Sequence, residues 1–352
     1  MTWEELDWPA LDRLRDGFLH GGAAAGPYWR SAGDLASYDF TYGERIGWKW
    51  DHVLRELRLR GWRPSARTVF DWGCGSGIAA RRVIAAFGAE AFDALTVWDH
   101  SPAACDFAAE AAQREFPALA VGSATPGLLA STERIGLLLV SHVLNELPPD
   151  ARAALRGLVM RADAVLWVEP GTHDVSRTLG LYRDELATPA GAAPFRVVAP
   201  CTHALGCPVL APDNERHWCH FFAPPPPAIF ADSNWTRFGQ RAGIDLRSLP
   251  YCFLALDRAP VATEDGLSRV IGRPEHFKPY ARLLNCDATG LAELTVPKRT
   301  APALYKELDR TRAPLVYRWE HDGATISGGT ALARAESRTG EPAGPEAAPV
   351  EG

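Results

Sequence analysis

The stretch that decides the fold is Thr68–Gly77, which reads TVFDWGCGSG. A short apolar run of strand type leads into a turn with three glycines, and a helix-like run, Ile78–Phe87, follows at once. Glycine adopts the backbone angles of a tight turn and lets the backbone approach a ligand closely. The helix behind the turn presents free N–H groups and the positive end of its dipole. This order of elements predicts a βα unit that binds a ligand at its glycine turn.

Strand-like and helix-like runs go on alternating after this unit. The strand-like runs are 95–99, 137–141 and 164–169, and the helix-like runs between them are 103–116 and 150–161. Such alternation is typical of βαβ units with a parallel sheet. We therefore predict a doubly wound, Rossmann-like α/β domain over residues 67–190.

The segments on either side of this domain differ from it in composition. Residues 1–66 are rich in tryptophan and predict a helical cap, in which Arg45–Arg60 has apolar residues at helical spacing. Residues 191–320 contain more cysteine, histidine and proline and predict a small cysteine-rich β module. Residues 328–352 have almost no large apolar side chain and predict a disordered tail.

Composition excludes several classes of protein. The 352 residues include 37 Lys and Arg against 43 Asp and Glu, a net charge of −6, which excludes a protein that coats nucleic acid by bulk charge. The hydrophobic content of 47% fits a globular chain with a sizeable core. No apolar run reaches 18 residues, so we expect no membrane span. Met1–Trp8 lacks the features of a signal peptide, so we expect a cytoplasmic protein, and we expect it to be a monomer.

Two acidic residues flank the glycine turn. Asp71 lies two residues before Gly73, and Asp99 ends the second strand 26 residues after Gly73, where a carboxylate can hold both hydroxyls of a ribose. The glycine spacing is GxGxG and not the GxGxxG of dinucleotide sites. The whole pattern resembles the S-adenosylmethionine (SAM) site of class I methyltransferases.

That resemblance implies a set of SAM contacts. The residues implied are Asp71, Gly73, Gly75, Gly77, Asp99, Ser141 and Asn145. Two features depart from the general methyltransferase pattern: no acidic residue follows the strand at 119–121, and Ser141–Leu147 contains no Asn/Asp-Pro-Pro-Tyr/Phe tetrapeptide. The catalytic residues and the methyl acceptor are therefore left unassigned.

Cysteines are clustered late in the chain. Three of the seven, Cys201, Cys207 and Cys219, fall within nineteen residues, and thiolates select zinc or an iron–sulfur cluster. A fourth ligand would be Cys286 or Cys252. Cys252 lies in an apolar run typical of a core thiol, whereas Cys286 precedes a turn from which a ligand can project. We prefer Cys286.

Four stretches identify a family resemblance. They are Ser141–Leu147 (SHVLNEL), Val168–Thr172 (VEPGT), Ala199–Cys207 (APCTHALGC) and His217–Phe222 (HWCHFF). In this order after a SAM loop, they resemble the methyltransferase-like assembly proteins of the small ribosomal subunit, which occur in bacteria and mitochondria. The resemblance covers roughly residues 35–320.

The resemblance implies a class I methyltransferase fold with a cysteine-rich module, and association with the maturing small subunit. It also implies a 4Fe-4S cluster held by four cysteines, with zinc as the alternative. The matching positions are Cys201, Cys207, Cys219 and Cys286.

Local charge favours an RNA partner. Residues 269–319 contain ten Lys and Arg but five Asp and Glu, a net charge of +5 within an acidic chain. We expect the partner to be the small ribosomal subunit and its rRNA. Two functions stay open: a SAM-dependent methyltransferase acting on rRNA or a ribosomal protein, and a non-catalytic assembly factor that binds SAM and the cluster.

Overall fold

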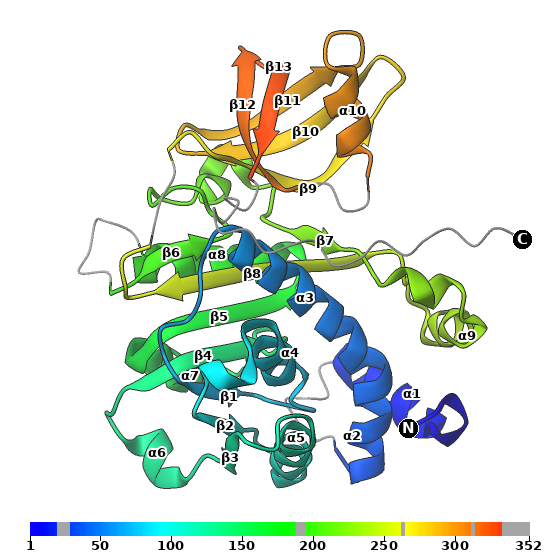
Figure 1. The fold of residues 1–352 in the computed structure, drawn as a ribbon, viewed down its shortest axis with the longest axis vertical. Coiled ribbons are helices and arrows are strands. Elements are labelled where there is room, and N and C mark those ends of the chain that lie inside the picture. The colour runs from blue at the N-terminus through cyan, green and yellow to red at the C-terminus, as the bar shows by residue number, and fades with distance from the viewer. Residues whose placement is uncertain (20–28, 188–193, 262–264, 311–313, 333–352) are drawn as a thin grey trace, which may run out of the picture.

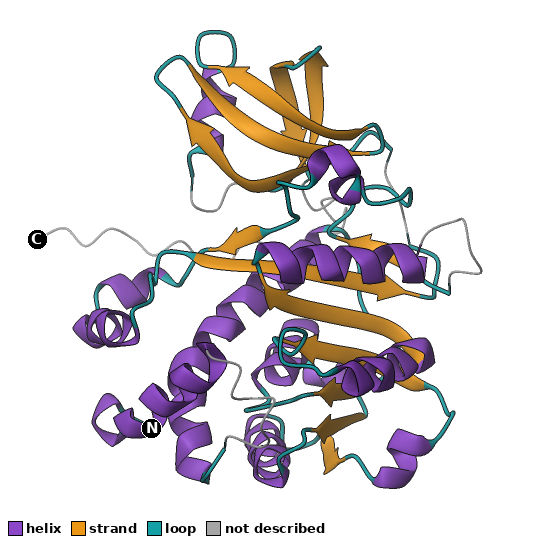
Figure 2. Cartoon of the chain, turned by 180° about the vertical axis from the view of Figure 1, so that it is seen from behind, coloured by secondary structure: helices purple, strands orange, loops and turns teal. Residues whose placement is uncertain are grey.

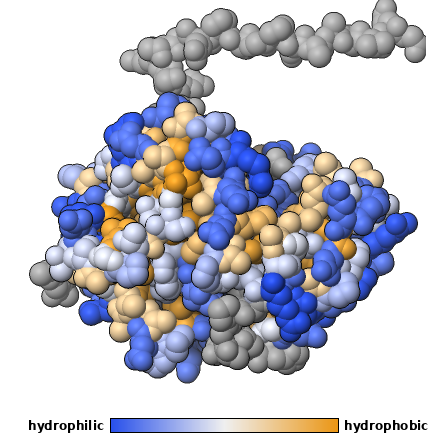
Figure 3. Space-filling view, turned by 90° about the horizontal axis from the view of Figure 1, so that it is seen from below, coloured by the Kyte–Doolittle hydropathy of each residue, from blue (hydrophilic) through white to orange (hydrophobic). Residues whose placement is uncertain are grey.

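The computed structural model describes residues 1–19, 29–187, 194–261, 265–310 and 314–332. It consists of an α/β part, and of a small β-barrel formed by the C-terminal strands (Figure 1). The barrel lies at one end of the molecule, and helices α5 and α6 lie at the other. On the face seen from below, most of the surface is polar and apolar residues are gathered in a few places (Figure 3).

The α/β part contains an eight-stranded sheet in the order β3-β2-β1-β4-β5-β8-β6, with β7 pairing to β8. Its strands are β1 (Thr68–Trp72), β2 (Ala94–Trp98), β3 (Ala120–Ser123), β4 (Ile135–Ser141), β5 (Ala162–Pro170), β6 (Arg196–Ala199), β7 (Phe221–Ala223) and β8 (Leu249–Asp257). Strands β1 to β5 are parallel to one another, while β8 is antiparallel to β5, β6 and β7. The predicted α/β fold with a mainly parallel sheet is therefore confirmed.

Helices cover both faces of this sheet, as the views from the two sides show (Figures 1 and 2). The helices of this part are α4 (Ile78–Phe87), α5 (Pro102–Glu115), α6 (Pro126–Ala130), α7 (Pro149–Arg161), α8 (His173–Ala187) and α9 (Ser233–Ala242). Of these, α9 lies beyond the ends of β7 and β8 and packs through Trp235 on Trp3 and Trp48. Adjacent residues of a strand point to opposite faces: Leu137 packs in the core on the α4 side and Leu138 in the core on the α7 side. Because both faces are covered, β4 is apolar almost throughout.

The N-terminal segment is helical, as predicted. It contains α1 (Trp8–Leu19), α2 (Ala32–Tyr38) and α3 (Glu44–Leu59), with one π-helical stretch, Asp39–Gly43, between α2 and α3. Helix α3 packs on α4 with Val53, Leu54 and Leu57 buried. Of the helices in the described residues, none combines the length and the apolar character needed to cross a membrane.

The C-terminal part is a closed five-stranded barrel in the order β10-β11-β13-β12-β9. Its elements are β9 (Ser268–His276), β10 (Tyr280–Asp287), β11 (Gly290–Pro297), α10 (Pro302–Leu308), β12 (Val316–Asp322) and β13 (Thr325–Ala331). Val270, Leu283, Val296 and Ile326 form its core.

The region predicted as a cysteine-rich module is built differently. Strand β8, expected in that module, belongs to the main sheet, where its apolar residues are buried between β5 and β6. The cysteine-rich segment 200–220 is a connection between β6 and β7, two strands that both pair with β8. Residues 328–331, expected in a disordered tail, are the end of β13. Residues 333–352 of that tail lie outside the described residues.

Candidate functional site

A cavity of about 470 Å³ lies at the carboxyl ends of β1, β2 and β4. The glycine turn, the end of β2 and the segment after β4 line one part of it, and Tyr38, Tyr42, Arg45 and Lys49 of the N-terminal helices line another. A cavity of this size suits a small-molecule ligand, and the carboxyl ends of parallel strands are the usual place for one.

The glycine turn is held in place by the end of β2. The backbone N–H groups of Gly73 and Cys74 both donate to the Trp98 carbonyl oxygen, at 2.8 and 3.0 Å. Gly73, Gly75 and Gly77 have φ angles of 72°, 50° and 76°, which other residues adopt at a cost. A Cβ at Gly73 would also lie 2.7 Å from Cγ1 of Val143. Both the angles and the space therefore require glycine here.

Asp99 is fixed against this turn. Its carboxylate accepts hydrogen bonds from the Gly75 N–H at 3.1 Å and the Ser101 N–H at 2.9 Å. Burial raises the pKa of Asp99, although these hydrogen bonds oppose the shift. Asp71 is fully buried behind the turn, and burial raises its pKa to about 7.

The structure thus places most of the predicted SAM contacts together. Gly73, Gly75, Asp99, Ser141 and Asn145 line the cavity, and Asp71 and Gly77 are not among its lining residues. Whether these residues bind SAM stays a prediction.

A lysine–histidine pair, which the sequence did not reveal, also lines the cavity. Nζ of Lys49, on α3, lies 3.0 Å from Nε2 of His142, which follows β4. His142 has a φ of 56°, and no other non-glycine residue in the described ranges has a positive φ. Burial, with Arg45 nearby, lowers the pKa of Lys49 to about 7, and burial holds the pKa of His142 well below its usual value. A neutral amine is therefore available in the cavity near pH 7.

Two carboxyl groups, Glu146 and Glu169, lie near the carboxyl ends of β4 and β5. Burial and the nearby Asp99 raise the pKa of Glu146, a cavity-lining residue, to about 7. Glu169, at the end of β5, is fully buried and accepts hydrogen bonds from Nε1 of Trp167 and the N–H groups of Val143 and Leu144. It thereby fixes the segment that carries His142.

The structure brings four of the seven cysteines together. Cys207, Cys219 and Cys286 pack in one group with Val209 and Ile271. Burial raises the pKa of the thiols of Cys207, Cys219 and Cys286, and the nearby Cys201 thiol raises all three further.

Cys252 lies elsewhere. Its Sγ lies 3.4 Å from the Pro170 carbonyl oxygen, in the apolar layer beneath α8. The four gathered cysteines are those preferred from the sequence. Their role as ligands stays a prediction.

Within the described residues, no three His, Cys, Asp or Glu side chains are arranged to hold a single metal ion. A 4Fe-4S cluster spreads its thiolate ligands over four iron atoms, which places the ligands farther apart than around one ion. Four thiolates are a donor set that either zinc or a 4Fe-4S cluster accepts.

The basic segment 269–319 is only partly a surface. Arg269 is 2% exposed and pairs with Glu56, and Arg282 pairs with Glu275 on the neighbouring strand. Arg312 lies outside the described residues. The basic residues therefore do not form one continuous face.

Comparisons with known proteins identify one matching family and many solved structures of low similarity. A family model described as mitochondrial small ribosomal subunit Rsm22 matches residues 52–313. No curated protein matches the chain at a significant level.

Three solved structures illustrate the fold similarity. Magnesium protoporphyrin IX methyltransferase from Synechocystis PCC 6803, with bound SAH, is 15% identical over 70% of this chain and 98% of its own, with a TM-score of 0.36. The plantazolicin methyltransferase BamL is 10% identical over 70% of this chain and 98% of its own, with a TM-score of 0.36. The 16S rRNA methylase RmtB is 16% identical over 55% of this chain and 69% of its own, with a TM-score of 0.31.

Similarity at these TM-scores does not place the chain with any of the three. The family model, in contrast, spans most of the chain and includes the glycine turn, the segment after β4 and all four gathered cysteines. The chain therefore belongs to the family described as mitochondrial small ribosomal subunit Rsm22.

Proposed function

We propose that this protein is a cytoplasmic, SAM-dependent methyltransferase that acts on rRNA or a ribosomal protein while the small ribosomal subunit matures. One observation carries the proposal: a ligand-sized cavity in which two left-handed glycines, Gly73 and Gly75, and the Asp99 carboxylate meet at the ends of parallel strands. The family description supports the small subunit as the partner. The class I methyltransferase assignment rests on the glycine and acidic pattern of the sequence.

The residues of the cavity fit the needs of SAM. Gly75 leaves the backbone bare at the turn, since a Cβ there would meet nothing within 4 Å, and Asp99 offers carboxylate oxygens for the ribose hydroxyls. SAM, when bound, supplies a methyl group on a positively charged sulfur, ready for in-line transfer. Most of the catalysis expected from the protein is then positioning of the acceptor.

Lys49 and His142 give the cavity a group that can accept a proton. An acceptor nitrogen or oxygen that bears hydrogen loses a proton when it gains a methyl group. The amine of Lys49, with its pKa lowered to about 7, can take that proton at neutral pH. His142, 3.0 Å away, holds the amine in position.

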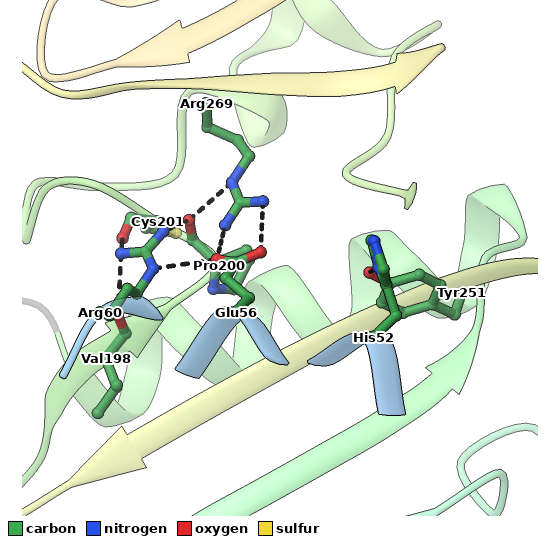
Figure 4. A network of polar contacts seen from close by, with 8 residues as sticks. All are labelled: His52, Glu56, Arg60, Val198, Pro200, Cys201, Tyr251 and Arg269. Carbon is green, nitrogen blue, oxygen red and sulfur yellow. Dashed lines mark hydrogen bonds and ion pairs between the residues drawn. The ribbon is translucent and has the colours of Figure 1, made fainter. Parts of the chain in front are cut away.

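We propose further that Cys201, Cys207, Cys219 and Cys286 hold a 4Fe-4S cluster, with zinc as the alternative. The cysteine segment is surrounded by buried arginines, which suit an anionic group bound by thiolates. Arg60 donates to the carbonyl oxygens of Cys201 and Pro200, and Arg269 also donates to Pro200 (Figure 4). Arg183, 2% exposed, lies near the Cys201 and Cys207 thiols.

A non-catalytic assembly factor is the second candidate. One observation favours it: the segment after β4 carries His142 and Val143 where many methyltransferases have the Pro-Pro-aromatic tetrapeptide. In that case SAM and the cluster would stabilise a conformation that docks on the small subunit.

The deciding experiment compares cells with and without the gene. Crosslinking in growing cells would identify the RNA contacts, and mapping of modified bases in small-subunit RNA, with mass spectrometry of its proteins, would identify a missing methyl group. Complementation with Asp99→Ala should restore neither the methyl group nor normal assembly if the protein is an enzyme. Full methylation without the gene would leave only the assembly-factor function.

A further inference from the structure

The barrel has a specific strand connection. Strands β9, β10 and β11 follow one another as antiparallel neighbours, α10 lies between β11 and β12, and the barrel closes through parallel β11–β13 and antiparallel β12–β9 pairs. This is the arrangement of the oligonucleotide/oligosaccharide-binding (OB) fold, in which the second and third strands and the adjoining loops contact the ligand. Because a fold alone does not determine function, the side chains on that face determine whether and which ligand binds there.

Half of the corresponding face is covered. Ile271 of β9 and Leu284 and Cys286 of β10 pack against Val209 and the cysteine segment. A ligand can therefore reach only the half of the face that lies farther from the α/β part.

The middle of the open half is electrically balanced. Nε of Arg282 lies 3.0 Å from the Glu275 carboxylate, and its NH1 lies 4.0 Å from that of Glu293. Arg216 of the cysteine segment also lies 3.9 Å from the Glu293 carboxylate. Two cations therefore face two acids, and a phosphate group finds no net attraction at this position.

The end of the barrel is different. The β9–β10 turn and the β11–α10 connection are joined there, because the Lys298 N–H donates to the Pro279 carbonyl oxygen at 2.9 Å. The Tyr305 hydroxyl of α10 donates to the Phe277 carbonyl oxygen, also at 2.9 Å. These bonds fix two loops and a helix as one surface, which we call the barrel tip.

The barrel tip combines one exposed aromatic ring with exposed cations. The Arg282 guanidinium lies over the Phe277 ring, 5.6 Å from its centroid, and Nζ of Lys298 lies 5.2 Å from the centroid of the half-buried Tyr305 ring. Phe277 is 40% exposed, and its ring centroid lies 5.0 Å from that of Tyr280. Lys278, Lys298 and Arg299 are exposed, and no ion pair involves any of them within the part of the chain that the structure describes.

Near the barrel tip, the Asp309 carboxylate lies 3.7 Å from Nδ1 of His276. Cations that attract phosphates, beside aromatic rings on which bases stack, are the features of single-strand nucleic-acid sites.

We propose that the barrel tip, formed by Phe277–Tyr280 and Lys298–Thr300, binds single-stranded RNA. The exposed part of the Phe277 ring would stack on one base and the three cations would contact phosphates. Neutral sugars would gain nothing from three unpaired cations, so an oligosaccharide fits this surface less well. The site lies outside the SAM cavity, and the proposal goes beyond methyl transfer and does not depend on it.

The test measures binding of the full-length protein to a labelled twelve-nucleotide single-stranded RNA by fluorescence anisotropy, without SAM, over a range of salt concentrations. For single strands the slope of log K against log salt changes by about 0.7 for each phosphate contact. Lys298→Ala/Arg299→Ala should therefore make the slope shallower by about 1.4. Phe277→Ala should weaken binding by roughly five-fold or more with the slope unchanged, because stacking is not electrostatic.

The matched control removes two exposed arginines elsewhere, Arg114 on α5 and Arg237 on α9. Arg114→Ala/Arg237→Ala should leave affinity and slope as in wild type, and all variants should keep the wild-type melting temperature. The proposal is overturned if the tip variants bind the single strand like wild type, if the control loses as much affinity, or if a duplex of equal length binds as tightly. Tip variants that bind RNA normally but lose the small subunit would identify a ribosomal protein as the partner instead.

Discussion

Arg269, on the first strand of the barrel, donates a hydrogen bond of 2.9 Å from NH1 to the carboxylate of Glu56, on helix α3. Both side chains are buried, and Arg269 also donates to the Pro200 carbonyl oxygen, at the start of the cysteine segment (Figure 4). One ion pair therefore joins the N-terminal helices, the cysteine segment and the barrel.

Replacing Glu56 by Gln should destabilise the protein by about 3–5 kcal/mol, because Arg269 would remain buried without its counter-charge. Burial opposes ionisation of Glu56, but Arg269 and Arg60 outweigh burial and lower its pKa to about 2. The ion pair therefore stabilises the fold above the usual glutamate pKa of about 4.3, and this stabilisation is lost as the pH falls toward 2.

Urea unfolding at several pH values measures both effects. Glu185→Gln, which removes an exposed partner of Arg156, serves as the control and should cost no more than about 1 kcal/mol. A Glu56→Gln protein as stable as this control, or one with the acid sensitivity of wild type, would contradict the prediction.

Replacing Asp99 by Ala should weaken SAM binding by about 1.5–3 kcal/mol, roughly ten- to 150-fold, because hydrogen bonds to a charged acceptor are lost. Asp93→Ala, at the opposite end of β2, is the matched control, since its carboxylate is exposed and pairs with Arg67. Isothermal titration calorimetry gives both affinities. Equal SAM affinities for the two variants would show that Asp99 does not contact SAM.

Replacing Lys49 by Met should lower the rate of methyl transfer by roughly 100- to 10,000-fold, the usual contribution of a general base, while SAM still binds. In wild type the rate should rise with pH through about 7, as the amine loses its proton. The charged and titratable groups that face this amine are Arg45, His142, Glu169 and Cys252. The Met variant should lack the rise.

Single-turnover rates across pH 5.5–9, with the exposed Lys306→Met as control, test this assignment. A Lys49→Met enzyme with the wild-type rate and pH profile would show that the acceptor needs no base at this position.

Anaerobically purified protein should contain iron and acid-labile sulfide near four each per chain, as a cubane with cysteine ligands requires. Cys286→Ser should lose most of the cluster, and Cys252→Ser should keep it, because Cys252 packs beneath α8 and away from the other thiols. Colourless protein with about one zinc per chain would assign the site to zinc. Loss of the cluster in Cys252→Ser but not in Cys286→Ser would make Cys252 the fourth ligand.

The α/β part could be predicted because its signals are local. The glycine turn and the alternation of strands and helices are read within a few residues, and β1 and α4 begin and end where predicted. Strand β8 was assigned to the wrong part, because an apolar run shows that a strand is buried but not which sheet buries it. The sequence did not predict the closed barrel, because β9 contains glycine and proline and lacks a clear alternation of apolar and polar residues.

The same limit applies to the site. Asp99 and the glycines were found because the spacing between them is fixed by a single βαβ unit. Lys49 and His142 are 93 residues apart and come from a helix and a loop, so only the packing of α3 against the sheet brings them together. One signal for Lys49 was available in the sequence. It stands between two tryptophans, Trp48 and Trp50, which are buried, and a lysine among buried residues is a candidate functional group.

The position of β8 in the sheet sets an order of events during synthesis. Because β8 lies between β5 and β6, the sheet cannot be completed until residue 257 has emerged from the translating ribosome. The barrel emerges next, and domains fold largely as they appear. A chain that stops before β13 would leave β11 without one of its partners, and an open strand edge invites pairing with another chain. Truncated nascent chains should therefore aggregate through the barrel while the cavity at the glycine turn is already formed.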